Sequence, residues 1–279
     1  MIYWGRGESN HLIELGKYLD RRINLMWTGR QIRSEYLDVI DAISFEKQSK
    51  RKPFFWDNFP VNNLALRNEL HFGPIENRAP DLFLHSRGIL ANPMLQFNSS
   101  MVSLFTIGEY LSDPENYNSS KSWENAIDFL FENPTEKSAL RTFFRANFGS
   151  PLSNDYAPDL RKTMNRVHSN ITKGDFPTAI LLLQDFAAEI SNSYDVITSQ
   201  SFSLIELRNE IEPWLASFKH NSNLLFSLSE LFKTEKIDKS KFLELQSAAD
   251  QHGYIVYKDV IWESMQEIFF YISNQEFFA

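Results

Sequence analysis

The sequence predicts an α/β region followed by an all-α region. Over residues 1–100, short apolar runs alternate with helical patterns, and from about residue 101 the strand-like runs give way to amphipathic helices. Strands that alternate with helices are typical of a parallel sheet covered by helices, as in a (β/α) barrel or a doubly wound sheet. We therefore expect the chain to change architecture near residue 100.

In the first region, three apolar runs predict strands, at residues 23–27, 53–56 and 88–90. Apolar residues at helical spacing predict two helices between these strands. The first is indicated by Leu12, Leu15 and Leu19, and the second by Ile32, Tyr36, Val39, Ile40 and Ile43.

In the second region, the apolar pattern predicts only helices. The first two are indicated by Val102, Phe105, Tyr110 and Leu111, and by Trp123, Ile127, Leu130 and Phe131. Later helices are expected near 134–147, 155–173, 177–198, 202–233 and 257–273. Asn133 before Pro134 is a typical helix start, and Gly174 is a typical break between two helices.

Composition excludes several classes of function. The net charge is −8, the pI is about 5.3, and the Lys and Arg residues are scattered, so we expect no nucleic-acid partner. No run is long and apolar enough for a membrane helix, and the first residues do not resemble a signal peptide. We expect a soluble chain and no membrane partner. A bacterial cytoplasm and a secreted parent both fit.

Metal and cofactor chemistry has no support in the sequence. Cysteine is absent, which removes disulfides, thiolate metal sites and cysteine nucleophiles. The six histidines show no metal-ligand spacing, and neither a phosphate-binding loop nor a Gly-x-Ser-x-Gly motif is present. We expect neither a metal nor a cofactor.

Polar and aromatic residues follow the predicted strands, at the end where a parallel sheet gathers its functional side chains. They are Thr28 after the first run, Trp56, Asn58 and Asn63 after the second, and Asn92 after the third. Amide side chains and indole faces suit a neutral, polyhydroxylated ligand. Equally, the same residues could cap turns and fill the rim of the sheet.

The order of the motifs carries a family resemblance. They are Tyr3, Met26-Trp27-Thr28-Gly29, Trp56 to Asn62, Phe72-Gly73-Pro74 and Asn92-Pro93-Met94. Over roughly residues 1–130 the chain resembles the C-terminal part of family 84 β-N-acetylglucosaminidases, the O-GlcNAcase and hyaluronidase-like enzymes. The resemblance implies a partial (β/α)8 barrel of the TIM type that lacks its N-terminal half. Residues 1–100 would form the C-terminal portion of the barrel catalytic domain, and residues 101–279 a helical bundle after it.

The resemblance also implies roles for site residues. Tyr3 would lie beside the 2-acetamido group of the sugar, and Trp56 would pack on the acetamide pocket. Asn58 and Asn92 would hydrogen-bond the reacting sugar, and Thr28 would line the same pocket. The expected ligand is an N-acetylglucosamine-containing glycan or glycoprotein.

Two features depart from the family pattern. Asn63 stands where the family commonly has an Asp that binds the outer hydroxyls, and a neutral acceptor bonds more weakly than a charged one. The family's hydrolysis is substrate-assisted and uses an Asp-Asp pair, but this sequence contains no Asp-Asp dipeptide. Strand alternation predicts that Asp57 points away from the side that Trp56 and Asn58 share. We therefore expect no catalytic residue in this chain and no turnover by the chain alone.

Three kinds of function stay open. The chain could act as part of a hydrolase whose acids come from an upstream half-barrel chain. It could be a catalytically dead sugar-binding or scaffold protein. It could be an interaction module built on the aromatic C-terminus, namely Phe269, Phe270, Tyr271, Phe277 and Phe278. Because a partial barrel exposes sheet edges, we expect a homo-oligomer or an upstream half-barrel partner.

Overall fold

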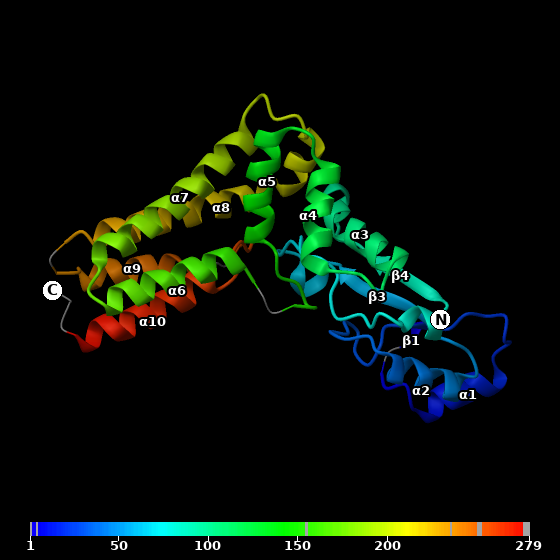
Figure 1. Cartoon of the computed structure of the whole chain (residues 1–279). Coiled ribbons are helices and arrows are strands. Elements are labelled where there is room, and N and C mark those ends of the chain that lie inside the picture. The colour runs from blue at the N-terminus through cyan, green and yellow to red at the C-terminus, as the bar shows by residue number, and fades with distance from the viewer. Residues whose placement is uncertain (1, 4, 154–155, 235, 250–252, 276–279) are drawn as a thin grey trace. The chain divides into compact units, whose positions relative to one another are not determined.

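The computed structural model describes residues 2–3, 5–153, 156–234, 236–249 and 253–275 (Figure 1). The chain forms two compact units. The first comprises Met1–Leu64, His71–Leu130 and Gly149–Asn154, and the second Ala65–Leu70, Phe131–Phe148 and Asp155–Ala279. The change of pattern near residue 100 lies inside the first unit, and the catalytic-domain boundary expected there stays a prediction.

The first unit is built on a four-stranded parallel sheet, which confirms the α/β prediction for this region. The strands, in their order across the sheet, are β1 (Ile2–Tyr3), β2 (Met26–Trp27), β3 (Phe54–Pro60) and β4 (Gly88–Asn92). The run at residues 23–27 forms a strand only at its end, and β1 was not predicted. The side chain of Tyr3 lies outside the described residues.

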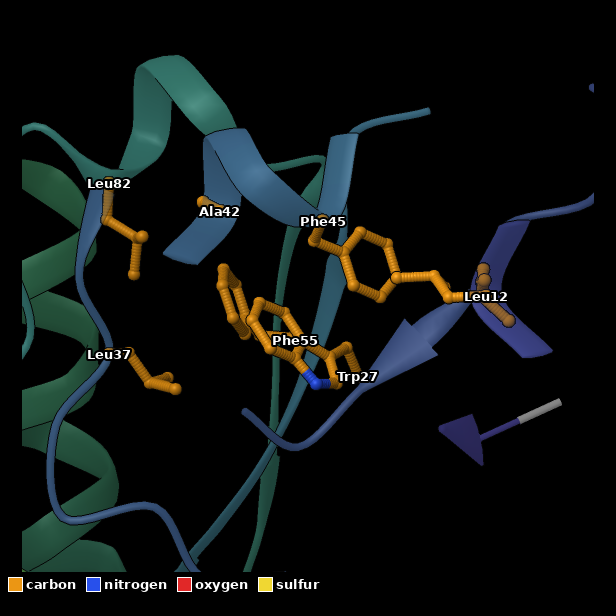
Figure 2. Packing of buried hydrophobic residues seen from close by; sticks show 8 residues of the cluster. Leu12, Trp27, Leu37, Ala42, Phe45, Phe55 and Leu82 are labelled. Atoms are coloured by element: carbon orange, nitrogen blue, oxygen red, sulfur yellow. The ribbon is translucent and has the colours of Figure 1, made fainter. Parts of the chain in front are cut away.

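One face of the sheet packs against α1 (Asn10–Tyr18) and α2 (Val39–Ser49), which lie side by side (Figure 1). Figure 2 shows the core between them, where the Trp27 ring stacks on Phe45 and Phe55. The ring centroids are 4.7 Å apart in the first pair and 5.7 Å in the second. This packing fixes the direction of β2 and β3 and hence of the residues that follow them.

The prediction for the second helix was wrong about where the helix starts. Its apolar pattern begins at Ile32, but α2 begins at Val39, after Asp38, whose carboxylate accepts a hydrogen bond of 2.7 Å from the Asp41 amide. Asp38 is thus an N-cap, which ends the preceding loop. Ile32 and Tyr36 lie exposed in that loop and do not face the core.

Two longer helices complete the first unit, α3 (Phe97–Ser112) and α4 (Ser119–Leu130), as the sequence predicts. Ile107 and Tyr110 of α3 share a core cluster with Phe59 of β3. Short 3-10 helices lie at η1 (Leu64–Leu66) and η2 (Leu82–His85). The helices therefore cover the sheet face that carries Trp27, Phe55 and Phe59.

The other face of the sheet is open among the described residues. Trp56 pairs in register with Leu90, and Pro60 with Asn92, so Leu90 and Asn92 share the face of Trp56. No residue of β4 is buried in the described structure, and Leu90 is 39% exposed. A half-exposed leucine inside a sheet strand indicates a face that another element could cover.

Among its described residues the second unit contains no strand and six α-helices, which confirms an all-α region. They are α5 (Pro134–Ala146), α6 (Pro158–Thr172), α7 (Phe176–Thr198), α8 (Ile205–Leu231), α9 (Lys239–Ala248) and α10 (Val260–Asn274). α7 and α8 lie side by side (Figure 1). α9 was not predicted, because it buries only Phe242 and Gln246 and so has little apolar pattern. Within the described chain, no helix is long and apolar enough to cross a membrane.

The aromatic residues of the C-terminus do not form one surface. Phe269 packs near Phe242, with ring centroids 5.7 Å apart, and the Tyr271 hydroxyl donates a hydrogen bond of 3.1 Å to the carbonyl of Thr172. Phe270 is 73% exposed. Phe277 and Phe278 lie outside the described residues. Of the three described aromatic residues on which the interaction-module alternative rests, only Phe270 is largely exposed.

Candidate functional site

The candidate site lies at the carboxyl ends of the strands, where Thr28 follows β2, Asn58 lies near the end of β3, and Asn92 ends β4. Because the strands are parallel, these ends meet at one edge of the sheet. β3 alternates, with Asp57 and Phe59 buried and with Trp56 and Asn58 half-buried on the opposite side. This alternation places the predicted aromatic and amide residues on the open face.

Three of the predicted site residues are joined directly, and we name them the trio (Trp56, Asn58 and Asn92). The Asn58 Oδ1 atom accepts hydrogen bonds from the Trp56 indole Nε1 at 2.9 Å and from the Asn92 Nδ2 at 2.8 Å. Both lone pairs of this carbonyl are thereby engaged. The trio thus adds side-chain hydrogen bonds to the backbone pairing of β3 with β4.

The trio is also tied to the loop after β2, which we name the rim loop (residues 28–38). The Asn58 Nδ2 donates a hydrogen bond of 2.6 Å to the carbonyl of Ile32. Within the loop, the Thr28 hydroxyl donates to the carbonyl of Gln31 at 2.8 Å. Thr28 is buried and holds the first turn of the loop, while Asn58 holds its middle. The position of Asn58 therefore depends on the rim loop.

The loop after β3 is held by Asn62, which the sequence analysis did not single out as a site residue. Asn62 is fully buried; its Oδ1 accepts a hydrogen bond of 2.9 Å from the Leu95 amide, and its Nδ2 donates to the Gln96 Oε1 at 2.8 Å. Its neighbour Asn63 is half-buried and lies three residues past the end of β3. The structure joins Asn62 to the segment after β4, and no described bond joins Asn63 to the trio.

Asp57 lies on the covered face, as the strand alternation predicts. Its carboxylate accepts two hydrogen bonds from the Arg78 guanidinium, at 2.7 Å and 2.8 Å. The two side chains are 3% and 1% exposed. A carboxylate paired in this way on the far side of the strand cannot reach a sugar held by Trp56 and Asn58.

Tyr110 of α3 lies beside this ion pair, and its hydroxyl donates a hydrogen bond of 2.9 Å to the carbonyl of Ala79. Burial of the hydroxyl raises the pKa of Tyr110 to about 12, against the opposing effect of the nearby Arg78 cation. The segment that carries Arg78 is thus held by a phenol that stays protonated at neutral pH.

Replacing Tyr110 by Phe is expected to reduce the free energy of unfolding by about 1 kcal/mol at neutral pH, because the hydrogen bond to Ala79 is lost. The raised pKa means that the folded state holds the proton more tightly than the unfolded chain does. Stability from Tyr110 is therefore fully present below about pH 10 and declines toward about pH 12.

The advantage of the unmodified chain over Tyr110→Phe should shrink above about pH 10. Urea unfolding of both proteins at about pH 8 and about pH 11 measures this difference, and other titrating groups cancel in it. A difference that is the same at both pH values would contradict the burial of the Tyr110 hydroxyl.

The histidines and acidic residues of the described chain form no group that could hold a metal ion. His71 is fully buried, and its Nδ1 lies 3.0 Å from the carbonyl oxygen of Pro60. This contact accounts for a polar residue in the core beneath the site.

Comparisons with known proteins identify relatives of the part of the chain that carries the sheet. A sequence model of the β-N-acetylglucosaminidase family matches residues 1–145, just over half of the chain. The chain belongs to the β-N-acetylglucosaminidase family. The match includes the whole sheet, the trio and the rim loop.

Among curated relatives of this β-N-acetylglucosaminidase-family chain, the protein O-GlcNAcases of Rattus norvegicus and Mus musculus are each 29% identical to it over 103 residues. The matched part is 37% of this chain and 11% of each relative, so the chain spans about a tenth of the curated relatives' length. What those whole proteins do is therefore not carried over to this chain by the match alone.

Solved structures share the fold of this family member. A mutant of the Thermobaculum terrenum O-GlcNAc hydrolase matches 98% of this chain and 62% of its own, with a TM-score of 0.81 and 24% identity. CpGH84B matches 96% of this chain and 50% of its own, with a TM-score of 0.78 and 20% identity. At these identities the likeness shows the fold, and it extends over the helical unit as well as the sheet.

Proposed function

We propose that this chain binds the N-acetylglucosamine residue of a glycan or glycoprotein at the carboxyl edge of its sheet. The observation that carries the proposal is the trio, in which three residues that the family resemblance places around the sugar are hydrogen-bonded to one another. Membership of the β-N-acetylglucosaminidase family supports the same ligand. The sheet would then be the C-terminal part of a (β/α)8 barrel.

The trio has the chemistry for a neutral sugar. The Asn58 carbonyl already accepts two hydrogen bonds, and one amide N–H of Asn58 and one of Asn92 are already donated. A ligand would therefore be received by the second N–H of each amide and by the Asn92 Oδ1. The half-buried Trp56 ring offers an apolar surface for sugar C–H groups or the acetamide methyl. Tyr3, Thr28 and Asn63 would complete the pocket, with Asn63 as the weaker acceptor.

We further propose that the chain alone does not hydrolyse the glycosidic bond. In substrate-assisted hydrolysis the acetamide oxygen of the sugar attacks the anomeric carbon while an acid protonates the leaving oxygen. Asp57, the carboxylate nearest to the trio in sequence, is paired with Arg78 on the opposite face. The acid pair would come from a different polypeptide segment.

This requirement separates the two candidate partners. A second copy of the chain has the same sequence without an Asp-Asp pair, so a homo-oligomer could cover the open face near Leu90 but could not supply the acids. An upstream half-barrel chain could do both. A scaffold protein that keeps the fold without binding sugar is the alternative function.

A binding titration with an N-acetylglucosamine thiazoline, which mimics the cyclised intermediate, tests the sugar pocket. We expect saturable binding by the unmodified chain, weakened at least about tenfold, or ~1.4 kcal/mol, by Asn58→Ala and by Asn92→Ala. Asn125→Ala, an exposed asparagine on α4 that bonds Glu109, is the matched control and should bind normally. No binding by the unmodified chain would contradict the proposal and favour a scaffold.

Hydrolysis of a chromogenic N-acetyl-β-glucosaminide tests the second part. We expect no turnover by the chain alone and turnover when a polypeptide that supplies the upstream barrel half is added. Turnover by the chain alone that Asn58→Ala abolishes would show that another acid in this chain does the work.

A further inference from the structure

Arg78 makes more contacts than an ion pair requires. Besides its two bonds to Asp57, its guanidinium donates to the carbonyls of Ser34 at 3.2 Å, Glu35 at 2.8 Å and Glu76 at 3.2 Å. Two of these carbonyls belong to the rim loop. A single buried side chain therefore connects β3 to the middle of the loop that follows β2.

Backbone hydrogen bonds also connect the rim loop to the segment around Arg78. The Leu37 amide donates to the carbonyl of Asn77, and the Ala79 amide donates to the carbonyl of Leu37, both at 3.0 Å. The segment around Arg78 is itself anchored, because Tyr110 bonds Ala79 and the Asn77 Nδ2 donates to the carbonyl of Leu152 at 2.8 Å. The rim loop is thus hydrogen-bonded to a segment that has further bonds of its own, to α3 and to Leu152.

The rim loop in turn carries the acceptor that orients Asn58, the carbonyl of Ile32. Ile32 lies two residues before the first carbonyl that Arg78 holds, that of Ser34. A change in the loop at Ser34 would move the Ile32 carbonyl and release the Asn58 amide, which then could rotate away from Trp56 and Asn92.

We propose that Arg78 is a positioning residue of the sugar site: it fixes the rim loop through Ser34 and Glu35, and the loop fixes Asn58 and hence the trio. The assignment to a sugar site rests on the proposed function above. Asp57 holds the guanidinium in place from the covered face of the same strand that presents Trp56 and Asn58. One buried ion pair therefore fixes the position of the rim loop relative to β3 and its site residues.

The chemistry requires arginine at this position. A guanidinium is planar and carries five N–H donors, so it can bind a carboxylate with two bonds and still donate to carbonyls on its other side. A lysine ammonium would keep the positive charge beside Asp57 but cannot reach the carboxylate and three carbonyls together. Arg78→Lys therefore separates charge pairing from positioning.

The test compares Arg78→Lys with Leu12→Ala, a core variant in the same unit. Leu12 lies on α1 in the core cluster that also contains Leu37, but no described hydrogen bond joins its side chain to the rim loop or the trio. Two readouts do not need a sugar. They are the indole N–H resonance of Trp56, whose hydrogen bond reports on Asn58, and hydrogen exchange of the Leu37 amide relative to the Phe54 amide, which bonds the carbonyl of Leu25 in the sheet.

We expect Arg78→Lys to shift the Trp56 resonance and to speed exchange at Leu37 at least about tenfold relative to Phe54. Leu12→Ala should speed both amides by the same factor and leave the resonance in place. With the thiazoline probe, Arg78→Lys should raise the Kd at least about tenfold, whereas Leu12→Ala should leave it unchanged. If Arg78→Lys does not fold, the double variant Asp57→Leu/Arg78→Met, which leaves no buried charge unpaired, should show the same three changes.

The outcomes are distinct. An unchanged Trp56 resonance and an unchanged exchange ratio in the folded variants overturn the positioning role, whatever the sugar data. If the unmodified chain does not bind the probe while both structural readouts respond to Arg78→Lys, the proposed sugar function fails and Arg78 positions the trio for another purpose. A raised Kd with both readouts changed supports the whole inference.

Discussion

Replacing Asp57 by Ala is expected to destabilise the first unit by about 3–5 kcal/mol. The substitution leaves the Arg78 guanidinium buried without its carboxylate, and its charge is then balanced only by carbonyl oxygens. The free energy of unfolding in urea, followed by tryptophan fluorescence, measures the loss. An aspartate at the surface, Asp81, provides the matched control, and Asp81→Ala should change stability by less than about 0.5 kcal/mol.

A double variant distinguishes the cost of the unpaired charge from that of the lost contacts. Asp57→Ala/Arg78→Leu removes both charges. It should be more stable than Asp57→Ala alone, because no buried charge is left unpaired, even though the carbonyls of Ser34, Glu35 and Glu76 lose this donor. If the loss of stability in the double variant equals the sum of the losses in the two single variants, the two side chains are not energetically coupled, which would contradict the ion pair in the structure.

Replacing Phe45 by Ala is expected to cost about 3–5 kcal/mol of unfolding free energy in the same unit. Phe45 is fully buried and stacks on Trp27, so its removal leaves a cavity between α2 and the sheet (Figure 2). Phe97→Ala is the matched control, because that ring is 71% exposed and should contribute less than about 0.5 kcal/mol. A Phe45→Ala protein as stable as Phe97→Ala would mean that the sheet and α2 do not share this core.

Much of the fold follows from local signals in the sequence. Asn133 and Pro134 start α5 as expected, with the Asn133 side chain accepting a hydrogen bond of 3.0 Å from the Thr135 amide. Gly174 ends α6 with a positive φ of 77°, which glycine adopts without strain. The rim loop was misjudged because Ile32 and Tyr36 have helical spacing by sequence, although they face solvent. Ile40 and Ile43 do lie in α2 but are exposed as well, and the buried face of that helix is formed by Ala42, Phe45 and Ser49, which the predicted pattern did not include.

The arrangement of the candidate site could be predicted where it depends on the alternation of side chains along one strand. Alternation along β3 was enough to separate Asp57 from Trp56 and Asn58. Arg78 lies twenty-one residues from its partner, and nothing near it in sequence indicates the pairing. Asn62 was considered only as part of a motif. Its hydrogen bond to Leu95 joins the segment after β3 to the segment after β4. Long-range contacts of this kind depend on the tertiary fold, and they produce no periodic pattern in the sequence.

The chain enters the second unit at Ala65–Leu70, between two long segments of the first, and it returns to the first unit at Gly149–Asn154. Within the second unit, the carbonyl of Asn68 accepts hydrogen bonds of 2.8 Å from the Trp214 indole and from the Ile255 amide. A recombination event at any single position would therefore give one unit only part of its own chain. We expect the two units to be inherited as one evolutionary module, and gene fusions that keep the unit with the sheet to keep the helical unit with it.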